Sequence, residues 1–527
     1  MTGEARPYGA YRWYVLGLFT LVYAFNFIDR QIVIILAPSL KADLGLTDAQ
    51  LGLLFGTAFA LFYALFGVPL AKLADGWHRV RTLSLGLSLW SALTACSGLA
   101  GHFAQLALAR VGVGVGEASA APAAFSILQD YFPKRQRATA LALYSCGIYL
   151  GSGASLMIGG GIVAAWDRLA ASAAGAPFAL KGWQAAYLAV GLPGLLLALL
   201  LLLTVREPVR GAIDGQPQPP APDPFRAALR ELGALFPLFG RSRANLALLL
   251  ACILGAVIAT EAAGHLLAPD KRALLGTIAG LPVSTNLVQW AAIAIGVYAT
   301  GSWVQSIRRR DPAAAALIVD SPSFVALAVG GGLLSLSSYG IAAFLYVYGK
   351  SYLGLPPEAG FTLGAISAAA GGLGTAIGGI VADRARLAHP AGRLWVAGIA
   401  ATLSTLLTLW QYNTASVTHF YLAYGLATLC LTMWLGPVFA TCQDHVLPRM
   451  RGVATAVQLL GTNLIGLGLG PYLVGLVSDV TGDLRLAILS VLALVPIVLA
   501  LFAFAARRLP AMEASLLDRA RAAGERV

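Results

Sequence analysis

Residues 71–79 read Ala71-Lys-Leu-Ala-Asp75-Gly-Trp-His-Arg79, and residues 379–386 read Gly379-Ile-Val-Ala-Asp383-Arg384-Ala-Arg386. Both stretches follow the second long apolar run of a series of six, and both place a small residue, an aspartate and basic residues in the same order. A pattern that recurs at the same ordinal position indicates an internal duplication. The chain is therefore predicted to consist of two related halves.

A second pair of stretches supports the duplication. The fifth run of the first half contains Gly147 and Gly151, and the fifth run of the second half contains Gly466 and Gly470. Glycines four residues apart let neighbouring helices approach closely. Two correspondences at matching positions predict a repeated six-helix unit, the arrangement expected of a membrane carrier with a site near the midplane.

Composition predicts that the chain lies in a membrane. Of its 527 residues, 58% are hydrophobic and only 11% are charged, and the mean hydropathy is +0.76. A water-soluble fold would not carry so large an apolar surplus. The net charge of +12 comes from basic residues in short clusters between apolar runs, which indicates orientation in a membrane and not binding of nucleic acid.

Apolar runs long enough to span a bilayer recur along the chain. They cover residues 13–38, 49–71, 82–101, 104–129, 138–163, 184–205, 244–268, 284–306, 322–348, 358–381, 391–411, 418–441, 453–477 and 484–506. The total is about fourteen, and the two runs after the polar segment 216–224 have no counterpart in the repeat. The sequence predicts an all-α membrane protein with two six-helix bundles and an inserted transmembrane hairpin.

Basic residues indicate the orientation of these spans. Arg241 and Arg243 precede the inserted pair and three arginines at 308–310 follow it, so both ends of the pair are expected in the cytoplasm. Both chain termini are expected in the cytoplasm too, and the protein is expected in a bacterial inner (cell) membrane. The first apolar run is expected to remain in the mature protein as a membrane anchor. The predicted domains are the N-terminal bundle 1–208, a cytoplasmic linker 209–243, the hairpin 244–310, the C-terminal bundle 311–508 and a cytoplasmic tail 509–527.

Longer motifs fill most of the spans. They are Asn26-Phe-Ile-Asp29-Arg30, Arg110-Val-Gly-Val-Gly-Val-Gly-Glu117-Ala-Ser119, Arg206-Glu207-Pro208, Trp434-Leu-Gly-Pro437, Gln443, Arg451, Asn463-Leu-Ile-Gly466, Gly470-Pro471 and Ser478-Asp479. Together with the two loops they resemble the major facilitator superfamily, and in particular its spinster branch. Ala71, Gly76 and His78 depart from the usual inner-loop motif.

The resemblance implies the major facilitator fold and transport by alternating access. Known spinster relatives include carriers of lysolipids and of sphingolipid phosphates, some of them proton-coupled. The resemblance therefore implies a small amphipathic substrate, such as a lysolipid, with protons as the coupling ion and membrane lipids as surroundings. It supplies no counterpart for the inserted hairpin, which is expected to be peripheral because twelve helices already complete the fold.

Ionisable residues inside the spans are the strongest site candidates. Each costs at least about 2.5 kcal/mol at the centre of a membrane helix, so each requires a partner or a role. Asp29 and Arg30 lie in the first span, and Arg110 and Glu117 share a helix face in the fourth, about 10 Å apart. We expect Arg110 or Arg30 to hold an anionic headgroup, Glu117 or Asp29 to exchange a proton, and Asp29 to face Arg110. The alternative is a static network that joins two helices.

The second half presents a different wall. Its first span carries Ser337 and Tyr339 where the first half carries charges, so an asymmetric cavity is expected, suited to an amphipathic or a sugar-like molecule. The predicted substrate-binding residues are Asn26, Arg30, Arg110, Tyr339, Trp434 and Asn463, and the predicted proton-coupling residues are Asp29 and Glu117. The predicted gate residues are Asp75, Arg79, Asp383 and Arg384, which would hold the cytoplasmic side shut; the alternative is ordinary loop charge.

The sequence thus predicts a secondary active transporter of a small amphipathic, anionic or lipid-like molecule. The alternative within transport is a facilitator or exporter of drug-like, steroid-like or organic-acid solutes without proton coupling. No catalytic nucleophile, acid–base pair or metal-ligand spacing is visible, so no enzyme, cofactor or metal is expected. A monomer is expected.

Overall fold

The computed structural model describes residues 9–132, 134–172, 177–209, 223–235, 243–272, 274–278, 281–356, 358–447 and 450–525. Within these residues, thirteen helical stretches are long and apolar enough to cross a membrane. The protein is a multi-pass, mainly helical membrane protein, which confirms the prediction from composition.

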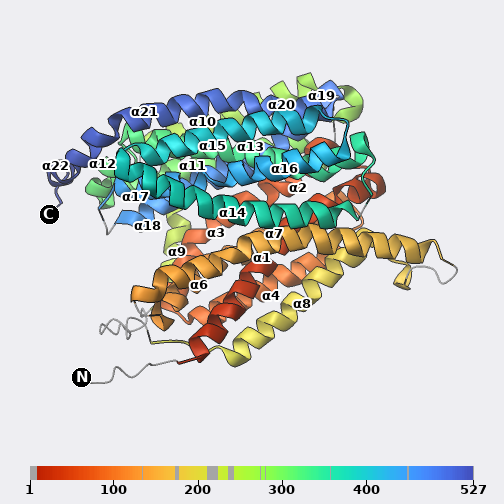
Figure 1. The fold of residues 1–527 in the computed structure, drawn as a ribbon, viewed down its shortest axis with the longest axis horizontal. Coiled ribbons are helices and arrows are strands. Elements are labelled where there is room, and N and C mark those ends of the chain that lie inside the picture. Colours follow the sequence, from red (N-terminus) through yellow and green to blue (C-terminus); the bar gives the residue numbers. More distant parts are fainter. Residues whose placement is uncertain are drawn as a thin grey trace. The chain divides into compact units, whose positions relative to one another are not determined.

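The first part of the chain forms the helices drawn from red to yellow-green in Figure 1. They are α1 (Tyr11–Leu44), α2 (Asp48–Phe55), α3 (Thr57–Gly76), α4 (Arg79–Ser97), α5 (Phe103–Glu117), α6 (Ala120–Tyr131), α7 (Lys134–Ala170), the 3₁₀ helix η1 (Pro177–Ala179), α8 (Gly182–Thr204) and α9 (Pro224–Leu235). The first six predicted spans correspond to α1, α2 with α3, α4, α5 with α6, α7 and α8.

The later part of the chain runs from green to blue. Its elements are α10 (Arg243–Leu266), η3 (Pro269–Lys271), β1 (Leu274–Ile278), β2 (Leu281–Ser284), α11 (Thr285–Arg310), α12 (Pro312–Ile318), α13 (Pro322–Leu353), α14 (Ala359–Ala388), α15 (Gly392–Asn413), α16 (Val417–Thr432), α17 (Leu435–Asp444), α18 (Arg451–Leu460), the π-helix η5 (Gly461–Leu467), α19 (Gly468–Thr481), α20 (Leu484–Ser490), η6 (Val491–Leu494), α21 (Val495–Ala514) and α22 (Leu516–Ala522). The eight later predicted spans all fall on these helices.

Several predicted spans consist of segments joined at a break. α2 and α3 meet at Gly56, and the carbonyl group of Leu467 lies where any Cβ on Gly56 would project. Short breaks also separate α5 from α6 and α16 from α17, and η5 interrupts the eleventh span of the repeat series. The segments on both sides of each break are apolar, so periodicity alone does not reveal it.

The third predicted span is α4, which is less apolar than the thirteen membrane-length stretches. Its arginines, serines and threonines lower its hydropathy. α4 packs against α5, α6 and α8, and Trp90 at its centre is fully buried. Neighbouring helices therefore cover much of a surface that would otherwise have to face lipid.

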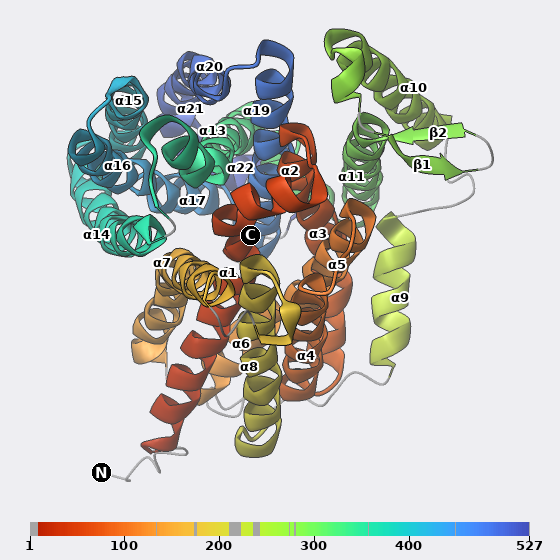
Figure 2. The same ribbon diagram turned by 90° about the vertical axis from the view of Figure 1, so that its right-hand side faces the viewer.

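The inserted segment contains two short strands that the sequence did not predict. β1 and β2 pair antiparallel between α10 and α11, with Leu274 opposite Ser284 and Ile278 opposite Leu281 (Figure 2). The pairing shifts register between Leu274 and Gly276. The strands supply partners for the backbone of the connection, so the two inserted helices are joined by a hairpin rather than an irregular loop.

Packing divides the chain into two compact units, and each is described by itself. Unit 1 contains Met1–Ser39, Phe62–Gly233 and Pro357–Ala365, and unit 2 contains Leu40–Leu61, Ala234–Pro356 and Ile366–Val527. Residues 40–61 belong to unit 2 because α2 packs closely against α19. The predicted domain boundaries follow the sequence repeat instead of packing, and they stay predictions.

Candidate functional site

A buried cluster of polar side chains lies inside unit 1, where α1 meets α5. Its members, all less than 10% exposed, are Asn26, Asp29, Arg30, Arg110 and Glu117, and we call them the α1–α5 cluster. The guanidinium of Arg30 donates from Nη2 to Oε2 of Glu117 at 2.9 Å and from Nε to the same oxygen at 3.2 Å. Arg30 also lies 3.5 Å from Oδ1 of Asn26, one helical turn earlier. The first and fourth spans are thus joined by a buried ion pair.

Arg110 binds the backbone of α1. Its Nη1 donates to the carbonyl oxygen of Asp29 at 2.9 Å, and its Nη2 donates to that of Arg30 at 3.0 Å. The predicted approach of Asp29 to Arg110 is therefore present, but it runs through the main chain of α1. A planar fork that holds two consecutive carbonyl groups fixes the rotation of α1 relative to α5.

The two carboxyl groups of the cluster have different surroundings. Neither carboxylate oxygen of Asp29 has a hydrogen-bond partner within the described part of the chain, and Oε1 of Glu117 is in the same position. Burying a carboxylate is costly unless a partner compensates its charge. Arg30 forms a direct ion pair with Glu117, whereas Asp29 is compensated less directly, by the charge of Arg110 and by the indole of Trp90. Two carboxyl groups with unequal compensation are suited to holding different numbers of protons.

Aromatic rings enclose Arg30 on its remaining sides. Its Cζ lies 4.7 Å from the ring centre of Phe27 on α1 and 5.0 Å from that of Tyr63 on α3. Cations over aromatic faces are attracted by the ring quadrupole. Arg30 is therefore held by an acid and by two rings, and it would keep the rings if the acid were neutralised.

Glycines bring the helices of the cluster close together. Gly116 on α5 lies against the backbone of Gly86 and Trp90 on α4, and Gly147 and Gly151 on α7 lie against the backbone of α1. A Cβ at any of these glycines would collide with main-chain atoms. The glycine repeat in the fourth span is thus a packing surface.

The predicted binding residues of the second half lie on three different elements of unit 2. Tyr339 is partly exposed on α13, whereas Trp434 is buried at the break between α16 and α17, within a hydrophobic cluster. The amide of Asn463 lies in η5 and donates from Nδ2 to the carbonyl group of Leu459, at 2.9 Å.

A small cavity of about 140 Å³ lies inside unit 2 among α13, α15, α16 and the start of α21. Its wall is uncharged and includes Ser337, Ser338, Ser404, Gln411 and Tyr424. Most of the serine hydroxyls donate to helix carbonyl groups, as Ser338 does to its own helix and Ser404 does to α16. The interior of unit 1 thus presents charges and this cavity of unit 2 presents hydroxyl groups, while the asymmetric cavity stays a prediction.

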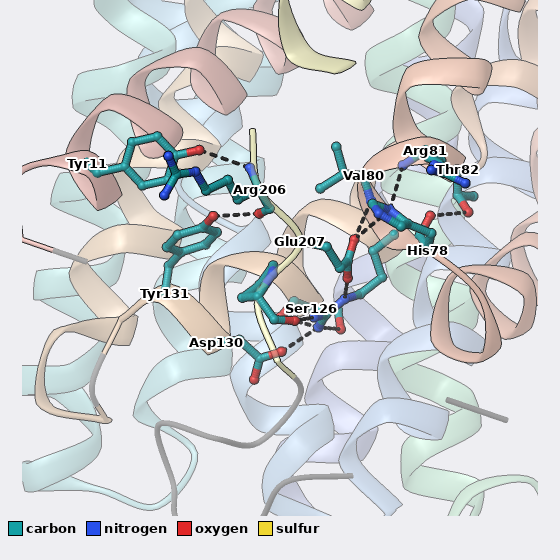
Figure 3. A network of polar contacts seen from close by, with 12 residues as sticks. Tyr11, His78, Val80, Arg81, Thr82, Ser126, Asp130, Tyr131, Arg206 and Glu207 are labelled. Carbon is teal, nitrogen blue, oxygen red and sulfur yellow. Dashed lines mark hydrogen bonds and ion pairs between the residues drawn. The ribbon is translucent and has the colours of Figure 1, made fainter. Parts of the chain in front are cut away.

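At one end of unit 1, Arg79 forms a buried ionic network. It donates to Asp130 at 2.5 Å, to Glu207 at 2.6 Å and to the carbonyl group of Pro208 at 2.7 Å, and it also contacts Ser126 (Figure 3). These partners come from α6 and from the segment after α8. We call this group the Arg79 network.

Backbone contacts extend the Arg79 network to α1. The hydroxyl of Tyr11 donates to the carbonyl group of Thr204 at 2.6 Å and accepts from the amide of Arg206 at 2.9 Å. The hydroxyl of Tyr131 donates to the carbonyl group of Arg206 at 2.6 Å (Figure 3). The motif that closes the sixth span is therefore an anchor that ties three helices together.

A similar group lies in unit 2, and we call it the Arg393 network. Arg393 on α15 donates to Asp383 at 2.8 Å and to Asp444 at 2.7 Å. Arg386 on α14 pairs with Glu513 at 2.9 Å and lies 3.5 Å from Asp444. These five charged residues connect the ends of α14, α15, α17 and α21.

Two of the four predicted gate residues belong to these networks, one to each. Arg79 and Asp383 are members, Arg384 is exposed next to its network, and the side chain of Asp75 lies outside the described residues. The sequence pattern missed Asp130, Asp444 and Glu513, because each lies far along the chain from the loop that it serves. Only their position beside the polar ends of spans could have indicated them.

Within the described residues, no group of three or more histidine, cysteine, aspartate or glutamate side chains could hold a metal ion. The five cysteines are unpaired. The polar groups of this chain are suited to binding, proton exchange and helix fastening.

Known proteins resemble this chain over nearly its whole length. The profile of the Major Facilitator Superfamily matches residues 19–471. An MFS-type efflux pump from Mycolicibacterium smegmatis (strain ATCC 700084 / mc(2)155) is 28% identical over 491 residues, which cover 92% of this chain and 89% of that protein. A gallate transporter from Pseudomonas putida is 31% identical over 233 residues, 44% of this chain and 48% of that protein.

A solved structure matches the fold. It is a crystal structure of a bacterial homologue of the human lysosomal transporter Spinster, in an inward-facing and occupied conformation. The TM-score is 0.70 with 26% sequence identity, and the match covers 95% of this chain and 98% of the other.

Proposed function

Because the chain belongs to the major facilitator superfamily as a spinster-like transporter, we propose that it moves a small amphipathic, anionic or lipid-like molecule by alternating access, coupled to protons. The observation that carries this proposal is the buried ion pair of Arg30 and Glu117 beside the buried carboxyl group of Asp29, which has no direct ion pair within the described residues. Membrane interiors retain such groups mainly for function.

In the proposed mechanism, Glu117 and an anionic substrate compete for Arg30. When Glu117 takes up a proton, its ion pair with Arg30 weakens, and the guanidinium becomes available to a phosphate or carboxylate group. The rings of Phe27 and Tyr63 keep Arg30 in place during this exchange. Asp29 is the second proton-coupling candidate, and Asn26 lies close enough to Arg30 to contact the same substrate group.

Arg110 has a supporting role in this mechanism. Its two hydrogen bonds to the α1 backbone hold the first span at the rotation that presents Arg30 to Glu117. Tyr339, Trp434 and Asn463 are proposed to meet the apolar part of the substrate. The Arg79 and Arg393 networks, with Asp75 and Arg384, are proposed to fasten the cytoplasmic side in one conformation.

Transport in liposomes tests the mechanism. The Glu117→Gln variant removes the titratable group but keeps its shape, so uptake driven by a pH gradient should fall at least about tenfold while exchange at equal pH persists. Glu358→Gln, a change at an exposed carboxylate, serves as the matched control. Wild-type transport that ignores the pH gradient would contradict proton coupling. A lysolipid and an aromatic carboxylate are the substrates to compare.

If transport is not coupled to protons, a second function is favoured. The full-length similarity to an efflux pump and the hydroxyl-lined wall of unit 2 favour a facilitator or exporter of drug-like, steroid-like or organic-acid solutes. Under that alternative, the α1–α5 cluster is structural. Equal loss of thermal stability in Asp29→Asn, Arg30→Gln, Arg110→Gln and Glu117→Gln, with unchanged transport per folded protein, would support it.

In the proposed topology the protein lies in a bacterial inner membrane, and both termini are on its cytoplasmic side. Phe178 and Leu387 are highly exposed and lie between spans on opposite predicted sides. In a variant without the native cysteines, Phe178→Cys should react with an impermeant maleimide from outside, and Leu387→Cys only from inside. Native mass spectrometry in mild detergent would test the proposed monomer and reveal any lipid that co-purifies.

A further inference from the structure

The inserted hairpin has one helix at the periphery and one that buries a face. Of the residues in the most apolar part of α10, only 6% are buried, as expected for a peripheral helix. α11 is held to α10 by a hydrogen bond of 2.8 Å from Asn245 to the hydroxyl of Tyr298. On its other side, α11 buries Asn286 and Gln289, which are 5% and 0% exposed. Buried amides require partners, and these two find them outside the hairpin.

The partners of α11 lie on α19. Oδ1 of Asn286 accepts from the hydroxyl of Tyr472 at 2.7 Å, and Nε2 of Gln289 donates to the carbonyl group of Gly468 at 3.1 Å. Trp290 meets the ring of Tyr472 edge-on, with ring centres 5.9 Å apart. Two hydrogen bonds and a ring contact thus fix α11 on the first turn of α19.

That turn of α19 is a distorted part of the eleventh span. It follows the π-helix η5, and Pro471 within it supplies no N–H to the carbonyl group one turn earlier. The carbonyl group of Gly468 accepts a second foreign hydrogen bond, from the hydroxyl of Thr57 at the start of α3. π-Bulges and prolines are the usual causes of helix bending, so α11 holds α19 at its most deformable point.

On another side, α19 packs against α2, and we call this contact the α2–α19 seam. Gly52 lies against the backbone at Pro471, and Gly475 lies against the backbone at Asp48. The carboxylate of Asp479 accepts from the amides of Asp48 and Ala49 at 3.2 and 2.7 Å. Asp479 therefore compensates the positive end of α2 and closes the seam.

The hairpin reaches this end of the seam as well. Nζ of Lys271, in η3, lies 4.0 Å from Oδ1 of Asp479. The hairpin thus touches α19 at both ends, through Asn286 and Gln289 at the first turn and through Lys271 near the last. Contacts at two ends constrain the direction of a helix more than contacts at one.

We propose that the inserted hairpin is a clamp that positions α19 against α2, with Gln289 and Asn286 as its positioning residues. This inference rests on the proposed alternating access, in which the α2–α19 seam must part during each cycle. Without the clamp, α19 would leave α2 more readily at the bend. The hairpin then sets how often the seam is open, although it lies outside the twelve repeat-related helices.

Spin labels across the seam test the clamp directly. Ala42, near the end of α1, and Val480, near the end of α19, are exposed and accept labels in a variant without native cysteines. The Gln289→Met and Asn286→Leu double variant keeps side-chain size and removes both hydrogen bonds. The ratio of long to short label distances should rise about tenfold, since each lost bond contributes a few-fold.

Matched variants separate the clamp from a general loss of stability. Asn245→Leu removes the buried hydrogen bond to Tyr298 within the hairpin, so it should change the distance ratio less than twofold. Lys271→Ala changes a half-exposed side chain that cannot impair folding, and it should raise the ratio about twofold. An unchanged ratio in both the double variant and Lys271→Ala would overturn the clamp.

The measurement also separates the clamp from the proposed transport. The label distances are read without substrate, so they report the seam even if no transported molecule is found. A shifted ratio with no transport of either tested substrate would leave the clamp standing and count against the proposed function. Proton-coupled transport together with an unshifted distance ratio would support the proposed function and count against the clamp.

Discussion

The Arg79 network and the Arg393 network are the same ionic fastening built twice, with unequal burial. Arg79 and Asp130 are 51 residues apart, and so are Arg393 and Asp444. In each case the arginine begins the third helix of a repeat and the aspartate ends the fourth. The Arg79 side chain is 1% exposed, whereas that of Arg393 is 17% exposed and its partner Asp383 is 70% exposed.

The difference teaches that a duplicated contact does not carry a duplicated energy. The buried side chain of Arg79 serves a carbonyl group and two acids that are 11% and 22% exposed, whereas Arg393 and Arg386 share acids that are 28% to 70% exposed. Ion pairs near water contribute little because solvent screens them, whereas an acid left alone in a buried site is costly. The following predictions test whether burial is what separates the networks.

The largest effect should come from Arg79→Ala. This change removes the guanidinium that Asp130 and Glu207 share, while Glu207 keeps His78 at 3.0 Å, so the free energy of unfolding should fall by about 3 kcal/mol, the low end of the cost of breaking a buried pair. Unfolding in mixed detergent micelles would measure it. Arg81→Ala, at an exposed neighbour, is the control. A loss below about 1 kcal/mol would mean that burial does not strengthen this network.

Arg393→Ala should have a clearly smaller effect. Water reaches Asp383 and Asp444, so the loss should be about 1 kcal/mol. Arg384→Ala, next in the chain to Asp383 and exposed, should cost almost nothing in the same assay. The comparison between the networks would collapse if Arg393→Ala proved as damaging as Arg79→Ala.

Acid should lower the stability of the protein near the Arg393 network, through protonation of His445. Burial lowers the pKa of His445 from its ordinary value of 6.5, although a bond to the carbonyl group of Thr441 opposes the shift, and Asp444, Glu513 and Arg519 also act on the ring. The unfolded chain therefore binds this proton more readily, so stability is lost as the pH falls below about 6.5. The slope should stay below about 1.4 kcal/mol per pH unit and disappear in His445→Gln. His389→Gln, at an exposed histidine, is the control. If the pH dependence of stability persisted in His445→Gln and disappeared in His389→Gln, its assignment to His445 would be wrong.

Salt should produce the smallest difference. Between about 0.05 and 0.5 M KCl, the coupling energy of Arg393 with Asp444 in a double-mutant cycle should fall by about half, because exposed charges are screened. The coupling of Arg79 with Asp130 should change little. Equal salt sensitivity in the two cycles would show that water reaches both networks alike.

Much of the architecture follows from the sequence, because apolar length and repeated loops are local signals. The spans, the insertion and the buried charges of the first and fourth spans were all predictable. The pairing within the cluster was not, because a pattern on one helix does not fix its rotation against another. Arg30 therefore pairs with Glu117, while Arg110 binds the backbone beside Asp29.

Other features depend on contacts that no local pattern records. The break at Gly56 follows from the approach of the carbonyl group of Leu467, more than 400 residues later. Asn286 and Gln289 look like ordinary polar residues in an apolar helix until Tyr472 and Gly468 are placed beside them. The inserted strands β1 and β2 were missed because they are short and weakly patterned.

The glycine-lined seam between α2 and α19 has a consequence for speed. At Gly52 and Gly475, backbone meets backbone, and no side chain projects into the opposite helix. Interlocked side chains must change rotamer before two helices separate, and each such change adds friction to the motion. Where backbone meets backbone at these two glycines, no such rotamer change is needed. The pace at which this seam parts is then set by a few polar fastenings at its ends, and a single substitution there changes the rate without altering the path.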